Sequence, residues 1–506
     1  MIPFDLFQRA AVRFADRIAL EAPDGSAMRF SELAARTDAL AAAIQDRIPA
    51  GSGRIGLCAT NSTDHVLALL AILASGRAWV PLNPRNGKGE LEAVLTLARP
   101  DAILCADDCR DRLPDWNEGP VIRVSAVPDG PAGPSIDDWM KSHHGRRPAR
   151  PLPDLSEVQA VKFTSGSSGK PKGVLQSYRC WNTHAVSIAH AFGFTAEDRF
   201  LAAAPITHGT SCFLLPVLSA GGAIVIPERP KPGPLLEAFA ERGVTGSYMT
   251  PTMIYNLLAE PGATDRAYPA MRHLIYSGAP MRVEQIRETL AVFPGALETS
   301  YGQAEAPQII SYLRGAEMAD PAAQGSVGQP GPLTRIGILG PDRAEVMPGE
   351  VGEIAVRGDL LSSGYIGNPE AQAETFVDGW LLTGDLGRFD ETGRLWIEGR
   401  KKEVIISGGF NVYPGEVENA LGGHPAVLEC TVFGIEDPKW GESVQAAVQL
   451  RDGATAEEAE IIAFVKKTLD SVKAPKRIHF LDDLPRNAVG KVMRRDAKAL
   501  ILERAS

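Results

Sequence analysis

Up to residue 300, short runs of β-branched residues alternate with longer amphipathic stretches. A strand-like run precedes a helix-like stretch four times, at 54–59 with 63–74, 78–82 with 88–98, 223–226 with 234–241, and 273–276 with 283–292. Strands that alternate with helices form parallel sheets, because each helix returns the chain to the starting edge of the sheet. The sequence therefore predicts an α/β fold with substantial parallel sheet over this region.

The pattern changes after residue 324. Residues 325–398 contain short strand-like runs separated by Gly turns, which predicts a small β subdomain. Residues after Arg400 predict a compact α+β unit, with helices near 416–421 and 457–469 and strands near 428–433, 444–450 and 477–481. A chain of 506 residues is too long to fold around a single compact core, so at least two domains are expected. We therefore predict a large N-terminal domain at 1–398, a hinge at 399–402 and a small mobile domain at 403–506.

The stretch Thr164–Gly173 reads Thr-Ser-Gly-Ser-Ser-Gly-Lys-Pro-Lys-Gly and directly follows a strand-like run. Its glycines allow close approach of the backbone to an anion, its hydroxyls donate hydrogen bonds, and its lysines supply charge. The glycine spacing does not match a P-loop, and Pro171 cannot continue into the helix that follows one. The stretch predicts a phosphate-binding loop of another kind, with a Gly/Ser-rich surface turn as the alternative.

Four further motifs follow downstream: Tyr301-Gly-Gln-Ala-Glu305, Thr383-Gly-Asp385, Gly399 to Glu418, and Pro485 to Arg494. In this order and at these separations, the five motifs resemble the core motifs of the adenylate-forming superfamily. That superfamily includes acyl-CoA synthetases, adenylation domains of peptide synthetases, and luciferases. The resemblance covers essentially the whole chain and implies ATP, Mg²⁺ and CoA as cofactors and co-substrates.

The resemblance also implies roles for individual residues. It assigns nucleotide binding to Thr164, Ser165, Gly166, Ser167, Ser168, Gly169, Lys172, Gly278, Ala279, Pro280, Ser300, Tyr301, Gly302, Asp385, Arg400 and Lys491. Asp385 is expected at the ribose, because a carboxylate accepts hydrogen bonds from a diol. Glu305 is expected to ligate Mg²⁺, a hard cation that prefers oxygen. Thr164, Glu305 and Lys491 are the expected catalytic residues, and Lys491 is a flexible cation suited to bridging carboxylate and phosphate oxygens.

Other residues are expected at the acid, the hinge and CoA. The acyl pocket is expected at His208, Tyr248, Gly278 and Gln303, with Lys402 as the hinge residue. Gly408 and Gly409 are expected next to CoA, as part of a strand or as a plain hairpin turn. One position departs from the pattern, since Ala304 stands where the superfamily usually has Thr. The segments expected around the acid's tail contain no Arg or Lys, at 208–215, 247–254, 276–281 and 301–310. Burying a second carboxylate without a cation is costly, so we expect an uncharged apolar tail.

Composition limits partners and location. The net charge of −10 gives no electrostatic case for nucleic acid or an anionic membrane. The six cysteines are scattered, as in a reduced protein. The longest apolar run, 66–76, is too short to span a bilayer, and the N-terminal residues lack a signal-peptide pattern, so we expect a cytoplasmic protein. The oligomeric state stays open, with a homodimer as one option.

The resemblance favours a two-step acid–CoA ligase that acts through an acyl-adenylate on a medium- or long-chain fatty acid or an aryl acid. An acyl-AMP ligase that loads a carrier protein is one alternative. A nucleotide-binding pseudoenzyme is another, disfavoured by the presence of Glu305, Asp385 and Lys491. A luciferase-like oxidoreductase is a further option, because a fold does not fix a function.

Overall fold

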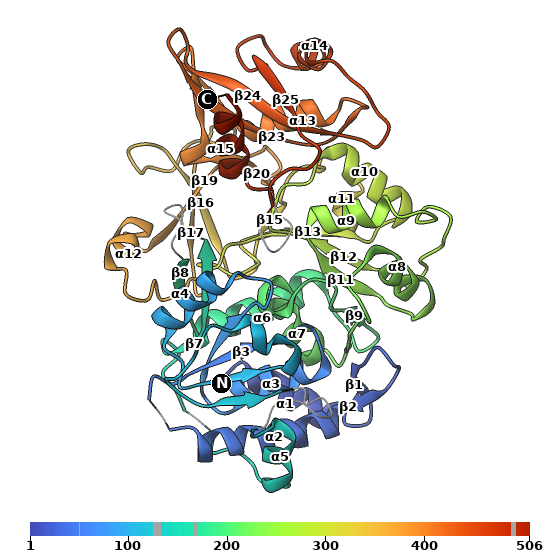
Figure 1. The fold of residues 1–506 in the computed structure, drawn as a ribbon, viewed down its shortest axis with the longest axis vertical. Coiled ribbons are helices and arrows are strands. Elements are labelled where there is room, and N and C mark those ends of the chain that lie inside the picture. Colours follow the sequence, from blue (N-terminus) through green and yellow to red (C-terminus); the bar gives the residue numbers. More distant parts are fainter. Residues whose placement is uncertain (50, 125–132, 151, 166–170, 487–491, 506) are drawn as a thin grey trace.

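The computed structural model describes residues 1–49, 51–124, 133–150, 152–165, 171–486 and 492–505. Figure 1 shows a large mixed α/β body that contains the N-terminus, with a smaller domain at the top that contains the C-terminus. The large body holds two sheets with helices around them, and a separate β subdomain lies between it and the smaller domain. The predicted fold class is confirmed.

The first sheet has the strand order β6-β5-β3-β4-β7-β8. Its strands are β3 (Arg54–Cys58), β4 (Ala78–Leu82), β5 (Ala102–Cys105), β6 (Val121–Arg123), β7 (Val158–Ser165) and β8 (Pro171–Ser177). Nearby helices are α1 (Phe4–Arg13), α2 (Phe30–Arg47), α3 (Thr63–Ala74), α4 (Lys88–Ala98), α5 (Ile136–Ser142) and the 3₁₀ turn η1 (Asp107–Arg112). Every pair from β6 to β7 is parallel, whereas β8 returns antiparallel to β7. The predicted alternation of strand and helix is therefore confirmed here.

The second sheet has the order β15-β14-β13-β12-β11-β9-β10-β1-β2. Its strands are β1 (Ile18–Glu21), β2 (Ala27–Arg29), β9 (Arg199–Leu201), β10 (Ala223–Val225), β11 (Gly246–Met249), β12 (His273–Tyr276), β13 (Leu297–Tyr301), β14 (Ser311–Leu313) and β15 (Gln329–Pro330). The run β10-β9-β11-β12-β13 is parallel. Accompanying helices are α8 (Pro232–Glu241), α9 (Pro251–Leu258), α10 (Val283–Val292) and α11 (Gly315–Met318). The carboxyl ends of the five parallel strands β10, β9, β11, β12 and β13 lie at the same edge of the sheet, which is where α/β sheets usually bind ligands.

Two helices connect the sheets. Helix α6 (Tyr178–Phe192) contacts β7 and β8 of the first sheet, and it also packs against α7 (Ser211–Ser219). Helix α7 in turn contacts β10 of the second sheet. A short irregular turn, η2 (Ile206–Thr210), leads into α7 and contacts β4. The segment around residue 208 is thus held between the two sheets.

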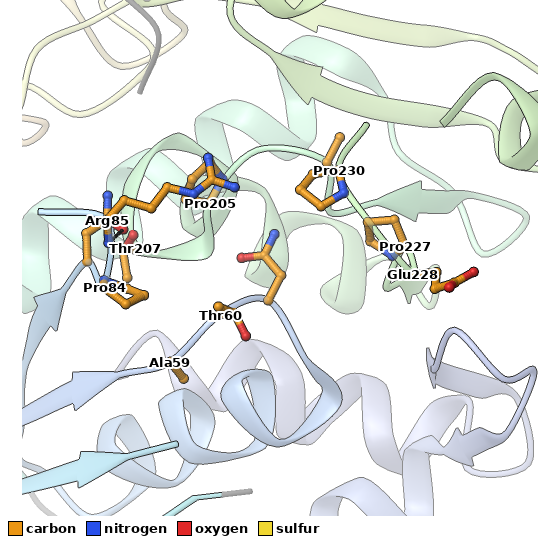
Figure 2. A pocket seen from close by; sticks show the side chains of 12 residues that line it. Ala59, Thr60, Pro84, Arg85, Pro205, Thr207, Pro227, Glu228 and Pro230 are labelled. Atoms are coloured by element: carbon orange, nitrogen blue, oxygen red, sulfur yellow. Dashed lines mark hydrogen bonds between the residues drawn. The ribbon is translucent and has the colours of Figure 1, made fainter. Parts of the chain in front are cut away.

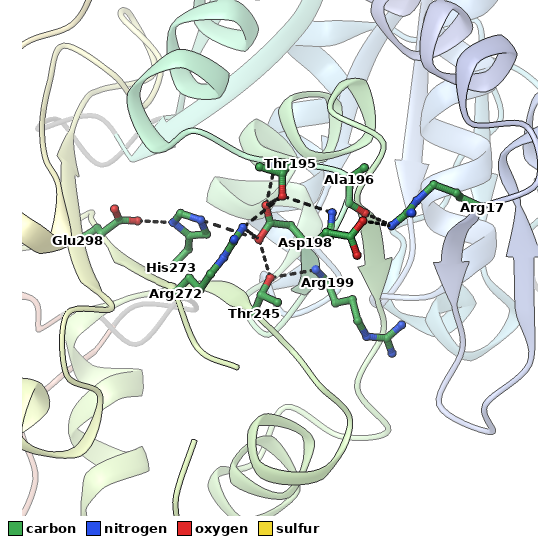
Figure 3. Close-up of polar contacts among 10 residues, drawn as sticks. Arg17, Thr195, Ala196, Asp198, Arg199, Thr245, Arg272, His273 and Glu298 are labelled. Atoms are coloured by element: carbon green, nitrogen blue, oxygen red, sulfur yellow. Dashed lines mark hydrogen bonds and ion pairs between the residues drawn. The ribbon is translucent and has the colours of Figure 1, made fainter. Parts of the chain in front are cut away.

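A buried polar cluster fastens the second sheet at its opposite edge. Figure 3 shows Asp198 accepting hydrogen bonds from Thr245 Oγ1 at 2.8 Å and from Arg272 at 2.5 Å, while His273 contacts Glu298 at 2.8 Å. The Glu298–His273–Asp198 arrangement resembles a catalytic set. However, these residues lie at the amino ends of their strands, away from the edge where α/β sheets bind ligands. We assign this cluster to holding neighbouring strands together.

The β subdomain and the C-terminal domain follow in sequence. The subdomain comprises β16 (Arg335–Leu339), β17 (Gly352–Arg357), α12 (Pro369–Thr375), β18 (Phe376–Val377), β19 (Trp380–Phe389) and β20 (Leu395–Arg400). After η3 (Lys401–Glu403) come β21 (Ile405–Ser407), β22 (Phe410–Val412), α13 (Pro414–Gly422), β23 (Val427–Asp437), β24 (Gly441–Leu450), α14 (Glu458–Thr468), β25 (Arg477–Phe480) and α15 (Arg494–Ala505). The C-terminal elements have their own apolar cores. The predicted boundaries at 398 and 403 remain proposals.

One cation bridges the two domains. Arg282, which precedes α10, donates to the backbone oxygen of Leu428 in β23. Its side chain also occupies the space that a Cβ on Gly422 of α13 would need. The smaller domain is therefore docked against the α10 side of the large one. Over the described residues, no helix is both long enough and apolar enough to cross a membrane.

Candidate active site

The described ends of the predicted phosphate-binding stretch pair as antiparallel strands. Thr164 near the end of β7 pairs with Lys172 near the start of β8, and Pro171 is the first residue of β8. The chain thus returns as a strand and not as a helix, which confirms that this is not a P-loop. The expected phosphate-contacting residues Gly166, Ser167, Ser168 and Gly169 lie outside the described residues. Their role in binding nucleotide therefore stays a prediction.

The turn 301–305 is fastened to this pair of strands. It follows β13, and the side chain of Gln176 in β8 donates to the backbone oxygen of Ala304 at 2.8 Å. Gly302 is required here, since a Cβ would overlap the backbone of Gln308. Ala304 packs in an apolar cluster with Val174 of β8 and Tyr365. The position where the superfamily usually has Thr is therefore occupied by a packing residue.

Glu305 lies at the far end of the same turn and is held by Tyr365. The Tyr365 hydroxyl donates to Oε1 of Glu305 at 2.6 Å, and the Lys172 ammonium lies 5.3 Å from the centre of the Tyr365 ring. Burial and the nearby Glu305 charge raise the pKa of Tyr365, so it stays a hydrogen-bond donor. Mg²⁺ is usually held by one or two carboxylates plus substrate phosphates. A single oriented carboxylate beside a phosphate-binding hairpin fits that requirement.

Asp385 of β19 forms the second polar centre. Its Oδ2 accepts hydrogen bonds from the Tyr301 hydroxyl at 2.6 Å and from the Gln303 amide at 2.7 Å, while Arg400 of β20 lies 2.7 Å from Oδ1. Asp385 and Arg400 are register partners, so the sheet itself holds the pair. Burial, with the Asp385 charge as a further cause, raises the pKa of Tyr301 well above its usual value. The expected ribose-binding residues are therefore gathered in one cluster.

The structure places one residue expected in the acyl pocket, Gln303, against β19, and its role at the acid stays a prediction. Gln303 was expected beside the acid's tail, but its amide donates to Asp385 and to the backbone oxygen of Thr383. The tight turn after Gly302 aims the side chain toward β19. In this structure Gln303 belongs to the Asp385 cluster.

The other expected acyl-pocket residues do meet. A Cβ on Gly209 would overlap the ring of Tyr248 from β11, and one on Gly278 would lie 3.7 Å from the Tyr248 hydroxyl. Gly278 has a φ of +87°, which favours glycine in the connection after β12. Next to Gly209, burial and the nearby charges of Lys162 and Arg85 lower the pKa of His208 to about 4. His208 is therefore neutral at pH 7.

The sequence interpretation missed Lys162. It lies two residues before Thr164 in β7, and its ammonium donates to Ser211 Oγ at 2.7 Å and to the backbone oxygen of His208 at 3.3 Å. The segments expected around the tail contain no cation of their own, yet Lys162 brings one to the segment 208–215. A cation is therefore present beside the expected acyl pocket, and a charged or polar group on the tail of the acid is not excluded by the surrounding residues. Motif matching could not find Lys162, because it stands just outside the Gly-rich loop.

A cavity of about 250 Å³ is lined in part by Pro205 and Thr207, which lie close to His208 in the sequence. Figure 2 shows it between the loops after β3 and β4 and the segments around Pro205 and Pro227. Its lining includes Thr60, Asn61, Asn83, Arg85, Thr207 and Glu228. Among the described residues, its walls include none of those expected to bind nucleotide, acid or CoA.

The hinge and CoA residues lie in the C-terminal part. Lys402 is exposed within η3, between the two domains. Gly408 and Gly409 form the turn between β21 and β22, with φ values of 60° and 81°, which is the hairpin-turn alternative. Consecutive positive φ values are typical of a two-residue hairpin turn. Lys491 lies outside the described residues.

Comparisons with known proteins identify the family of this chain. Residues 7–366 match the family "AMP-binding enzyme", and residues 416–491 match "AMP-binding enzyme C-terminal domain". A medium/long-chain-fatty-acid–CoA ligase of Mycobacterium tuberculosis is 34% identical, covering 76% of this chain and 69% of that protein. An indoleacetate–CoA ligase of Aromatoleum aromaticum is 31% identical, covering 97% of this chain and 95% of that protein. The ATP-bound structure of MatB from Rhodopseudomonas palustris has a TM-score of 0.88 at 28% identity, covering 100% of both chains.

The chain therefore belongs to the AMP-binding enzyme family of the adenylate-forming superfamily, in which it is acyl-CoA synthetase-like. It is an enzyme of the AMP-forming ligase class.

Proposed function

We propose that this protein joins a carboxylic acid to CoA in two steps. In the first, a carboxylate oxygen attacks the α-phosphorus of ATP, forming acyl-AMP and releasing pyrophosphate. In the second, the CoA thiol loses its proton and attacks the acyl carbon, forming the thioester and releasing AMP. The proposal rests on the residues described above and on the family to which the chain belongs.

The strongest support for the proposal is the way in which one turn connects the expected nucleotide-binding residues. The turn 301–305 links the Asp385 cluster to the Glu305 carboxylate, and Gln176 fastens that turn to the phosphate-loop hairpin. A nucleotide with its ribose at Asp385 would therefore direct its phosphates toward Thr164, Lys172 and Glu305. Fixed donors and charges at these positions would stabilise the charge that develops on the phosphoryl group.

Each residue has a separate task in this scheme. Asp385 and Arg400 would position the ribose, and Tyr301 would pack against the base. Glu305, oriented by Tyr365, would hold Mg²⁺, which supplies charge neutralisation to the phosphates when bound. Lys491 would donate to carboxylate and phosphate oxygens during the first step only. Rotation at Lys402 would then bring Gly408 and Gly409 toward CoA.

The acid itself is proposed to have a mainly apolar body, aliphatic or aryl. Tyr248, Gly209 and Gly278 surround its expected position, next to a neutral His208. The absence of a side chain at Gly209 lets the Tyr248 ring lie against the backbone there, and a Cβ on Gly278 would lie 3.7 Å from the Tyr248 hydroxyl. A medium- or long-chain fatty acid and an aryl acid both fit this description.

The test is acid-dependent release of pyrophosphate and AMP by the purified protein. Hexanoate, octanoate and benzoate are each supplied with ATP and Mg²⁺, first without and then with CoA. We expect pyrophosphate release in both cases and thioester only with CoA. Transfer to a carrier protein and not to CoA would favour the acyl-AMP ligase alternative, and no reaction with any acid would favour a pseudoenzyme.

A matched variant separates the steps. Lys491→Ala should slow acid-dependent pyrophosphate release by roughly 100-fold or more, since it removes a cation needed as phosphoryl charge develops. The same variant should still convert synthetic acyl-AMP and CoA to thioester. Equal loss of both half-reactions in a folded variant would overturn the role of Lys491.

A further inference from the structure

Lys162 lies deep between the sheets and has an unusual set of neighbours. Its ammonium contacts Ser211 Oγ at 2.7 Å and the backbone oxygen of His208 at 3.3 Å, and it lies 4.8 Å from the centre of the Trp79 ring. An ammonium has three N–H donors. Among the described residues, two acceptors are recorded for them, which leaves one donor for a further partner.

No negative charge balances this cation within the described part of the chain. No carboxylate there forms an ion pair with Lys162, and burial lowers the pKa of its ammonium. Burial also raises the pKa of the neighbouring Cys212 thiol, so that group stays neutral. A buried charge without a counter-charge is costly, so its presence at this position needs an explanation.

The surroundings add positive potential. Ser211 begins α7, whose amino end carries a partial positive charge. Burial, together with the Lys162 charge, lowers the pKa of His184 to about 4 and contributes to the same value at His208. Both imidazoles are therefore neutral at pH 7 and offer no compensating charge. The cluster as a whole favours an electronegative group.

Lys162 also lies next to the expected acyl pocket. Its acceptors belong to His208 and Ser211, and Gly209 between them touches the Tyr248 ring. Lys162 keeps some accessible surface despite its depth, as do His208 and Gly209. The ammonium and the residues beside it are therefore not sealed off from solvent.

We propose that Lys162 determines substrate specificity by donating a hydrogen bond to an oxygen on the tail of the acid. The substrate is then a carboxylic acid with an apolar body that carries a second oxygen group, which is a hydroxyl, carbonyl or carboxylate. This inference rests on the proposed acid–CoA ligase function. It replaces the expectation of a purely apolar tail.

The test compares matched acids on the wild type and three variants. One set is hexanoate, 5-hydroxyhexanoate, 5-oxohexanoate and hexanedioate. The second is 3-phenylpropanoate with its 4-hydroxy, 4-acetyl and 4-carboxy derivatives. The kcat/KM for pyrophosphate release is measured without CoA for wild type, Lys162→Met, Lys162→Arg and the surface control Lys141→Met.

In the wild type, at least one oxygenated acid should exceed its apolar parent by roughly 10-fold or more, the size expected for a hydrogen bond to a charged group. Lys162→Met keeps length and flexibility but removes the donor. It should abolish that preference and leave the apolar parent within about threefold. Lys162→Arg should retain part of the preference, and Lys141→Met all of it.

Two outcomes would overturn the inference. The first is a wild type that turns over the apolar parents without preferring any oxygenated acid. The second is a folded Lys162→Met variant that loses activity equally on every acid, which would place Lys162 at the reacting carboxylate or in the scaffold. If Lys162→Met does not fold, the test uses the preference for an oxygenated acid in the wild type and in Lys162→Arg. A preference in both proteins supports the inference, and its absence from the wild type overturns it. Failure of the ligase proposal looks different, since no acid would then release pyrophosphate, and this inference would fall with it.

Discussion

The hydroxyl of Tyr365 lies 2.6 Å from Oε1 of Glu305, although 60 residues separate them in the sequence. This contact fixes one oxygen of the only carboxylate in the turn 301–305, and Gln176 of β8 holds the same turn through the backbone oxygen of Ala304. Groups that orient a metal ligand often affect metal affinity nearly as much as the ligand does.

Replacing Tyr365 with Phe should therefore weaken the response to Mg²⁺. We expect the Mg²⁺ concentration for half-maximal adenylation to rise roughly 10-fold, with a near-normal rate at saturation. The measurement is the rate of pyrophosphate release against Mg²⁺ concentration at fixed ATP. Tyr312→Phe, which alters a hydroxyl on β14, serves as the control. An unchanged Mg²⁺ response would remove Tyr365 from the site.

Asp385 provides a test of the nucleotide pose. Asp385→Asn keeps the shape but removes the charge that pairs with Arg400. The wild type should prefer ATP over 2′,3′-dideoxy-ATP by roughly 10-fold or more, since hydroxyls at the ribose would bond to a charged group. The variant should lose most of this preference. A variant that still discriminates between the two nucleotides would show that the ribose lies elsewhere.

The hinge prediction concerns Lys402. Proline fixes φ and also restricts the preceding residue, so Lys402→Pro should hold one docking pose. The side chain of Lys402 is exposed, so the change removes little packing. We expect near-normal acyl-AMP formation with thioester formation slowed by roughly 100-fold or more, because only the second step needs the other pose.

Lys402→Ala is the matched control for this experiment and should behave like the wild type in both steps. The two half-reactions are followed separately, as pyrophosphate exchange and as acyl-CoA formation. Normal overall turnover by Lys402→Pro would mean that the hinge lies elsewhere.

Stability should depend on pH through His65. It is fully buried, and burial lowers its pKa from the usual value of about 6.5 to about 4. Between these values the unfolded chain binds the proton and the folded chain does not, so stability falls as the pH drops from 6.5 toward 4. One such group contributes a slope of about 1.4 kcal/mol per pH unit.

His65→Asn should therefore flatten the fall in melting temperature between pH 7 and pH 5, even if it lowers stability at pH 7. The exposed His144 offers a control, since His144→Asn should leave the fall unchanged. Parallel curves for His65→Asn and the wild type would contradict the assigned pKa.

The sequence predicted the layers of the fold well, because periodicity reports which face of each element is buried. The paired runs at 54–74 and 273–292 appear as β3 with α3 and as β12 with α10. Motifs also located the Asp385 and Glu305 clusters. The direction of a side chain was harder to predict from the sequence. Gln303 follows Gly302 in a tight turn, and the path of that turn depends on packing with the rest of the fold.

Contacts between distant segments could not be predicted either. Tyr365 reaches Glu305 from outside every motif, and Lys162 meets Ser211 only because β7 and α7 are neighbours in the fold. Neither residue type is unusual where it stands in the sequence. Such contacts need the three-dimensional structure.

The central claim is that the acid is activated as an acyl-adenylate. The most direct measurement uses an acid labelled with ¹⁸O in both carboxylate oxygens, together with ATP and CoA, and analyses the products by mass spectrometry. If a carboxylate oxygen attacks the α-phosphorus and leaves with AMP, each AMP should carry one ¹⁸O and the pyrophosphate none. Label in inorganic phosphate with ADP as the nucleotide product, or unlabelled AMP alongside labelled thioester, would contradict the account.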